Sequence, residues 1–255
     1  MTESPYLLGN FTTAEAAASV ARGDIVILPA GAFEQHGPAM PLATDLIRAE
    51  AVADRAAGAM DGRAVIGPSL PVGVSPHHLS FAGTVSLRPA TFLAVAREYV
   101  DSLAGHGWRR ILILTGHAGN NATLAALAQD LLHDLPDVEF AWSAVPALAT
   151  EAIATMNRTE VTGHCGESET AQMLYLAPHL VRTELLAPGA TSLDDLDPLS
   201  RLSRRAAPSL ARRYDQLSTN GVLGDPTTVT ADQGRAIVDA ATRTLVDYLR
   251  EWLTA

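Results

Sequence analysis

Arg110-Ile-Leu-Ile-Leu114, followed at once by Thr115-Gly-His-Ala-Gly-Asn120, is the most informative stretch of the chain. Its first five residues form a continuous run rich in branched apolar side chains, which is typical of a strand buried on both faces of a parallel sheet. The glycine-bearing turn leads into an apolar helical pattern that reaches residue 132. The stretch therefore predicts a strand, a loop and a helix in direct succession.

The same succession recurs on both sides of this stretch. Further strands are predicted at 24–28, 64–66 and 138–145, and further helices at 46–60 and 89–103. Capping-box spacings after Thr12 and Thr230 predict helices that reach Arg22 and about Trp252. Strands that alternate with helices indicate an α/β fold with a mostly parallel sheet covered on both faces. Without a linker or a repeat, we expect one domain over 1–255, with 187–220 as a surface excursion.

Composition excludes several function classes. The formal charge of -10 disfavours nucleic acid as a partner, and the absence of lysine excludes P-loop nucleotidases and Schiff-base enzymes. The single cysteine, Cys165, excludes an internal disulfide and a cysteine-based zinc cluster. The sequence has no apolar run of the roughly 18 to 20 residues that cross a bilayer, and no leader pattern is recognisable. We therefore expect a cytoplasmic protein with no membrane partner.

Polar residues follow the predicted strands at the points where ligands collect in open α/β sheets. These candidates are Glu34, His36 and Asp45 after the first strand, His117 after the clearest strand, and His164, Glu167 and Glu169 farther along. Imidazoles and carboxylates are ligands for Zn, Mn or Fe ions. The set exceeds what one tetrahedral ion needs, so it predicts two divalent ions with one bridging carboxylate.

Each candidate also has a plain structural interpretation. Glu167 and Glu169 are compatible with first-turn carboxylates that a helix dipole favours. A glutamate and a histidine in a loop are commonly a solvated pair, and His117 between glycines can belong to a simple turn. Cys165 beside His164 suggests a thiol nucleophile, but a buried free cysteine is the favoured interpretation. All the carboxylates and imidazoles occur in the same type of loop, one that follows a predicted strand. This shared position favours the metal site.

Five segments, in order along the chain, carry a resemblance to a known family. They are Leu28-Pro-Ala-Gly-Ala-Phe-Glu-Gln-His-Gly-Pro38 with Asp45, Gly73-Val-Ser-Pro-His-His-Leu-Ser-Phe-Ala-Gly-Thr84, Thr115-Gly-His-Ala-Gly-Asn120, His164-Cys-Gly-Glu-Ser-Glu-Thr170 and Gly221-Val-Leu-Gly-Asp-Pro226. Together they resemble the creatininase family of metal-dependent amidohydrolases. The resemblance implies a three-layer α/β/α fold, a dinuclear Zn, Mn or Fe site, hydrolysis of a non-peptide amide, and a homo-oligomer, commonly a hexamer.

The resemblance also implies residue roles. Glu34 and His117 would hold one ion, His36 the other, and Asp45 would bridge them, while His164 matches the family's proton-donating histidine. Creatininase proper has a further carboxylate ligand two residues after the histidine that matches His117, where this chain has Gly119. We infer from the sequence that Glu167 fills this vacancy, with Glu169 as an orienting residue or an alternative ligand. His78 and Ser75 are expected substrate contacts.

The substrate is less closely defined by the resemblance. The tryptophans with which creatininase closes over creatinine have no counterpart in 147–163, which makes creatinine a doubtful substrate. We expect a small-molecule amide, cyclic or a formamide, to be cleaved by a metal-bridged hydroxide with His164 as general acid. The alternatives are a metallopeptidase that trims a peptide C-terminus, as in the mycofactocin branch, and a metal-bound sensor without turnover.

Overall fold

The computed structural model describes residues 4–255, which build a four-stranded parallel sheet. Its strands are β1 (Ile25–Ala30), β2 (Ala64–Ile66), β3 (Arg110–Thr115) and β4 (Glu139–Ala144), in the order β2-β1-β3-β4. The two central strands are in register through pairs such as Leu28 with Ile113. The predicted parallel sheet is therefore confirmed.

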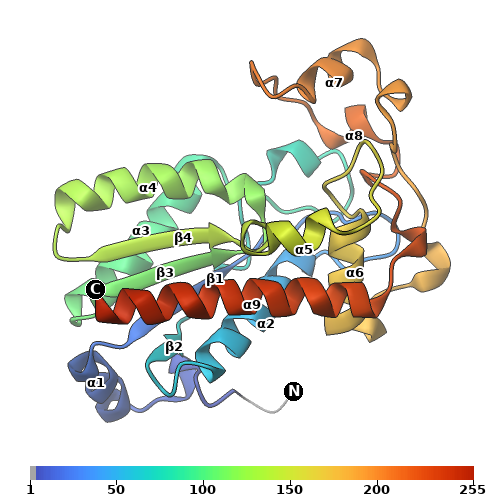
Figure 1. The fold of residues 1–255 in the computed structure, drawn as a ribbon. Helices are drawn as coiled ribbons and strands as arrows, with labels where there is room; N and C mark the ends of the chain where they lie inside the picture. Colours follow the sequence, from blue (N-terminus) through green and yellow to red (C-terminus); the bar gives the residue numbers. More distant parts are fainter. Residues whose placement is uncertain (1–3) are drawn as a thin grey trace.

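Helices cover both faces of this sheet and complete three layers (Figure 1). Because side chains alternate along a strand, Ile25 and Ile27 pack on one face while Val26 and Leu28 pack on the other. The first face is covered by α2 (Thr44–Gly58) and α9 (Ala231–Thr254), and the second by α3 (Pro89–Gly105) and α4 (Asn121–Asp134). The three-layer α/β/α prediction is correct.

Local sequence signals account for two helix starts and one helix end. Thr12 and Glu15 form a reciprocal capping box at the start of α1 (Thr13–Arg22), and Gly23 ends the helix with a positive φ of 71°. Thr230 and Gln233 form the same box at the start of α9. Both predicted helix starts are confirmed.

The other helices lie around one end of the sheet (Figure 1). They are α5 (Thr150–Ala154), α6 (Glu167–Leu176), α7 (Pro198–Ser203) and α8 (Tyr214–Leu217), with short 3-10 turns that include η2 (Pro76–His78). The predicted excursion at 187–220 extends away from the layers, with α7 near its tip. None of the described helices is both long and apolar enough to span a membrane.

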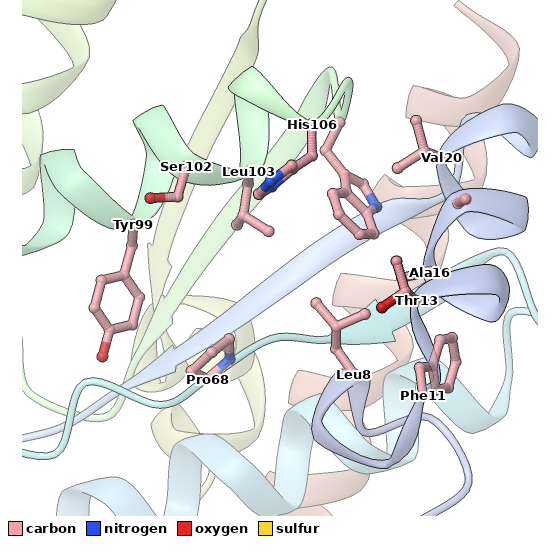
Figure 2. A pocket seen from close by; sticks show the side chains of 12 residues that line it. Leu8, Phe11, Thr13, Ala16, Val20, Pro68, Tyr99, Ser102, Leu103 and His106 are labelled. Carbon is pink, nitrogen blue, oxygen red and sulfur yellow. The ribbon is translucent and has the colours of Figure 1, made fainter.

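An open apolar cavity of about 640 Å³ lies between α1 and α3. Figure 2 shows Leu8 and Phe11 on one side of it and Tyr99 and Leu103 on the other. The residues that line this cavity include no carboxylate, and none of them is among the predicted site residues. The chemistry predicted from the sequence therefore lies elsewhere.

Candidate metal centre

Imidazoles and carboxylates gather beyond the carboxyl ends of β1, β2 and β3, around a pocket of about 130 Å³. Each connection after a strand supplies part of the set, and the start of α6 supplies the rest. The side chains that meet here are Glu34, His36, Asp45, His77, His78, His117, His164 and Glu169. Five of the eight histidines of the chain thus lie in one place.

Glycine allows the strand ends to approach the ligands closely. A Cβ atom on Gly116 would clash with the backbone carbonyl of Asp45, so the end of β3 can touch the first turn of α2 only because residue 116 has no side chain. Asp45 and His117 are brought together by this contact. Gly116 therefore helps to set the position of His117 relative to Asp45.

The distances between these groups match those between ligands of a shared ion. His117 Nδ1 lies 3.2 Å from Glu34 Oε1 and 3.3 Å from Asp45 Oδ2. His36 Nε2 lies 3.5 Å from Asp45 Oδ1. Two ligand atoms that are each about 2.0–2.2 Å from a tetrahedral ion lie roughly 3.3–3.6 Å apart. These separations are close to that interval, so the spacing is compatible with a shared ion.

Several atoms in this cluster are buried without a hydrogen-bond partner among the described residues. The acceptors among them are both carboxylate oxygens of Glu34, His36 Nε2 and Asp45 Oδ2, and two further nitrogens, Arg48 Nη2 and His78 Nε2, also lack a partner in the described part of the chain. Buried polar atoms are nearly always satisfied, so a concentration of unsatisfied acceptors points to a cation. The donor set fits a divalent metal on this ground as well as on spacing.

Backbone carbonyls orient three of the imidazoles. His36 Nδ1 donates to the Glu34 carbonyl at 3.1 Å, His117 Nε2 donates to the Val74 carbonyl at 3.1 Å, and His164 Nε2 donates to the Gln35 carbonyl at 2.7 Å. Because a carbonyl only accepts, each imidazole nitrogen bound to one must carry the proton. The opposite nitrogen of each ring then directs a lone pair at the cluster, as a metal-binding histidine does.

Asp45 and Glu169 are linked by a buried arginine. Arg48 Nη1 lies 2.7 Å from Glu169 Oε1 and 3.2 Å from Asp45 Oδ1, and the arginine has no solvent exposure. The other Glu169 oxygen lies 3.7 Å from His36 Nε2. Asp45 directs one oxygen towards His36 and the other towards His117, which is the arrangement a bridging ligand needs.

Glu167 lies outside the cluster, contrary to its predicted role as a ligand. Its Oε1 accepts hydrogen bonds from the backbone N–H of Thr159 at 2.9 Å and of Asp225 at 3.2 Å, and its Oε2 accepts one from Thr162 at 2.7 Å. Two residues along a helix differ by roughly 200° in direction, so Glu167 and Glu169 cannot face the same side. The structure brings Glu169 to the site and uses Glu167 to hold neighbouring loops.

The two expected substrate contacts differ in position. His78 lines the pocket, and its Nε2 lies 3.4 Å from Glu34 Oε1. Ser75 is buried beside His117, and its hydroxyl lies 3.5 Å from His117 Nε2, the nitrogen that faces away from the carboxylates. Ser75 therefore supports the back of the imidazole and is not among the residues that line the pocket.

The electrostatics of the cluster favour positive charge. Burial lowers the pKa of His36, but Asp45, Glu169 and Glu34 outweigh burial and raise it to about 9. Burial also opposes charge on His117, yet Asp45 and Glu34 hold its pKa well above the usual range. By contrast, burial and the neighbouring His36 lower the pKa of His164 to about 3. The carboxylates thus attract protons to two imidazoles as they would attract a divalent cation.

Sequence reasoning missed three residues of the site. His77 lies beside His78 in η2, with its ring centroid 5.6 Å from that of His117. Tyr214 at the start of α8 places its ring centroid 4.0 Å from that of His78 and 4.9 Å from that of His164. Arg48, three residues after Asp45 on α2, was detectable from its helical spacing. Nothing in the sequence around Tyr214 indicated its place.

The geometry agrees with a comparison against protein families, in which the model described as creatinine amidohydrolase matches residues 9–249. The chain belongs to the creatininase family. It is 32% identical to the mycofactocin precursor peptide peptidase of Mycobacterium ulcerans, over 96% of this chain and 92% of that protein. It is 29% identical to the creatinine amidohydrolase of Pseudomonas putida, over 98% of both chains.

The fold of this creatininase-family chain has a close match among solved structures. A structure described as "Creatininase Mn" superposes with a TM-score of 0.84 at 25% identity, and the match covers 98% of this chain and 99% of that one. The match extends through both helical layers because it covers nearly the whole of both chains. The resemblance drawn from the sequence motifs is therefore confirmed at the level of the family and the fold.

Gly119 accounts for the departure from creatininase proper. A Cβ atom at this position would clash with the imidazole of His117 and crowd the carbonyl of Val74. The ring of His117 thus occupies the space into which a side chain at residue 119 would extend. A carboxylate ligand from this position is incompatible with the orientation of His117.

Proposed function

We propose that the chain is a dinuclear metal-dependent hydrolase that cleaves a carbon-nitrogen amide bond of a small molecule. The observation that supports this most directly is Asp45, whose two oxygens face two different histidines, each accompanied by a further carboxylate. Such an arrangement offers two adjacent positions for divalent ions with one bridging ligand. Membership of the creatininase family agrees with this chemistry.

In this proposal Glu34 and His117 hold one ion, His36 and Glu169 hold the other, and Asp45 contacts both. Zn, Mn and Fe all accept these ligands, and a solved relative is described as a manganese form. When bound, the ions would polarise an amide carbonyl and acidify water at neutral pH. Glu169 takes the place that the sequence analysis gave to Glu167.

His164 is proposed to transfer a proton from the attacking water to the leaving nitrogen. Its Nε2–H is fixed on the Gln35 carbonyl, and its Nδ1 lies 3.7 Å from Glu34 and 3.9 Å from Glu169. The neutral ring can take the proton that the attacking water loses and pass it to the leaving nitrogen, so that a neutral amine departs. His164→Ala should therefore lower kcat by about 10²–10⁴-fold. Elemental analysis of the variant should still find two ions, and loss of an ion would identify His164 as a ligand.

The size of the pocket favours a small acyl group. Its volume of about 130 Å³ is well below the roughly 300–1,000 Å³ typical of sites for drug-sized ligands. Tyr214 and Pro146 lie among the residues that line it. A formamide or a small cyclic amide fits such a space.

A second candidate is a metallopeptidase that removes the C-terminal part of a peptide. It is favoured by the M. ulcerans relative, a mycofactocin precursor peptide peptidase that matches over 96% of this chain. The same metal-binding side chains would serve both reactions. The two candidates differ in whether the substrate extends beyond the pocket.

A metal-replete activity screen across formamides, cyclic ureas and short peptides tests the proposal. Turnover of a formamide or a cyclic amide alone supports the small-molecule assignment, and turnover of peptides alone supports the second candidate. Bound metal without turnover of any of these classes would favour a sensor. Failure of the protein to bind divalent metal would overturn the proposal altogether.

A further inference from the structure

The side-chain amide of Gln35 has its orientation fixed by two backbone groups. Its Oε1 accepts the N–H of Gly37 at 2.8 Å, and its Nε2 donates to the carbonyl of Gly221 at 3.2 Å. Exchanging the oxygen and nitrogen would place donor against donor and acceptor against acceptor. The Nε2 of Gln35 is therefore the atom that lies 2.8 Å from His78 Nδ1.

This contact determines which nitrogen of His78 carries the proton. Because Gln35 donates to Nδ1, that nitrogen must offer a lone pair, and a neutral imidazole then has its proton on Nε2. The Nε2 atom is buried, has no hydrogen-bond partner among the described residues, and belongs to a ring that lines the pocket. Its nearest carboxylate oxygen, Glu34 Oε1, is 3.4 Å away.

His78 therefore differs from the three imidazoles that are oriented by backbone carbonyls. Those rings, of His36, His117 and His164, present lone pairs to the cluster, whereas His78 presents an N–H group. A nitrogen that carries a proton cannot bind a metal ion, although His78 is close enough to Glu34 and His164 to share one. The available N–H suits an oxygen that gains negative charge.

We propose that His78 is a catalytic residue whose Nε2–H donates to the substrate carbonyl oxygen as the amide is attacked, and that Gln35 is the positioning residue that fixes this tautomer. The inference rests on the proposed amide hydrolysis. On attack the carbonyl π electrons move to oxygen, and they return when the C–N bond breaks. His78 keeps its proton throughout, and the leaving nitrogen receives its proton from His164.

The tautomer can be measured without a substrate. Zinc-loaded protein labelled with ¹⁵N-histidine gives two-bond ¹H–¹⁵N correlations that distinguish the two neutral tautomers from the imidazolium, and His78→Gln assigns the signal. Near neutral pH we expect the Nε2–H tautomer at His78. Gln35→Glu places a carboxylate opposite Nδ1, so the proton should appear there. An Nδ1–H or doubly protonated His78 in the wild-type protein would overturn the inference.

Kinetics on a substrate from the activity screen test the catalytic role. Preorganised donors to an oxyanion contribute about 10²–10³-fold in kcat, so His78→Phe should lose that much with little change in KM or metal content. Gln35→Glu should also lower kcat, although Gln35 does not line the pocket. His133→Phe, at an exposed position near the end of α4 and outside the pocket, is the matched control and should keep the wild-type kcat.

The outcomes separate this inference from the proposed function. Full kcat in His78→Phe would exclude a role as donor, and loss of a metal ion in that variant would make His78 a ligand. A wild-type protein that binds no metal and hydrolyses no amide would overturn the proposed function. The tautomer measured in the metal-free protein would then still test the part assigned to Gln35.

Discussion

Arg48 is fully buried between two carboxylates of the site, Asp45 and Glu169. Removing one partner of a buried ion pair leaves an uncompensated charge and costs about 3–5 kcal/mol. Bound metal ions would neutralise the same carboxylates. We therefore expect Arg48→Gln to lower the free energy of unfolding by about 3–5 kcal/mol in chelated protein and by less in metal-loaded protein, as urea titrations of both forms would measure.

Arg55→Gln is the matched control for this change, since Arg55 lies two turns farther along α2. Its ion pair with Asp239 is partly exposed, and such pairs contribute about 1 kcal/mol or less. This control should lower the free energy of unfolding by the same small amount in chelated and metal-loaded protein. If Arg48→Gln loses the same free energy of unfolding in chelated and metal-loaded protein, then the metal ions do not neutralise the carboxylates that Arg48 neutralises.

Glu169 and Glu167 provide the sharpest comparison of two like residues. Glu169 lies among the histidines, whereas Glu167 binds loop N–H and hydroxyl groups. Glu169→Gln should reduce the metal content from two ions per chain towards one, because it removes a charged ligand. Glu167→Gln should keep both ions. Elemental analysis after gel filtration measures the difference, and the reverse pattern would restore the ligand assignment made from the sequence.

At the scale of elements, local patterns predict the layers and the approach of the strand ends. The succession of strands and helices around β1 and β3 is a local signal, and so are the capping boxes at Thr12 and Thr230. The structure follows all of these signals. The distinction between Glu167 and Glu169 depends on the rotational phase of α6, which packing against its neighbours sets. Because the first turn of a short helix carries both residues, no local pattern could decide which one faces the site.

The position of α8 could not be predicted from the sequence either, because it depends on how a long connection returns to the site. The segment 187–220 is rich in Asp, Arg, Ser and Pro and predicts only a surface excursion. In the structure its last helix brings Tyr214 against His78 and His164. Only the tertiary fold places this ring over the cluster.

Tyr214 on α8 is expected to act on substrate binding. Its ring closes one side of the pocket, and aromatic contacts contribute about 0.5–1.5 kcal/mol beyond area burial. Tyr214→Ala should raise KM by about tenfold while both metal ions remain bound. Steady-state kinetics measure this effect. Tyr214→Phe should retain the wild-type KM if the ring is responsible, and a KM raised equally in both variants would assign the effect to the hydroxyl.

At the scale of the whole molecule, we expect metal binding to be coupled to folding. A ligand that binds only the folded state at a hundred times its Kd adds about 2.7 kcal/mol, which in a chain of this size corresponds to a Tm increase of about 5–10 °C. Differential scanning calorimetry of chelated and manganese-loaded protein should show this increase. Equal Tm values would indicate that no metal is bound at the cluster.

The stability gained from metal should also grow with pH. In chelated protein the raised pKa of His36 means that its ion pairs stabilise the fold fully below about pH 6.5, and that this contribution is lost as the pH rises through about 9. Metal requires the neutral imidazole and binds better as the pH rises. The Tm difference between the two forms should therefore be larger at pH 9 than at pH 6, and a constant difference would contradict this coupling.

The chain order of the clustered side chains has a consequence for biogenesis. Glu34 and Asp45 leave the ribosome early, His117 follows only after two further strands, and Glu169 emerges after the whole sheet. Domains fold as units during synthesis, from the N-terminus onwards. A nascent chain therefore cannot complete the proposed position for the second ion until α6 is free of the exit tunnel, so binding of that ion would be a late step in the maturation of the protein.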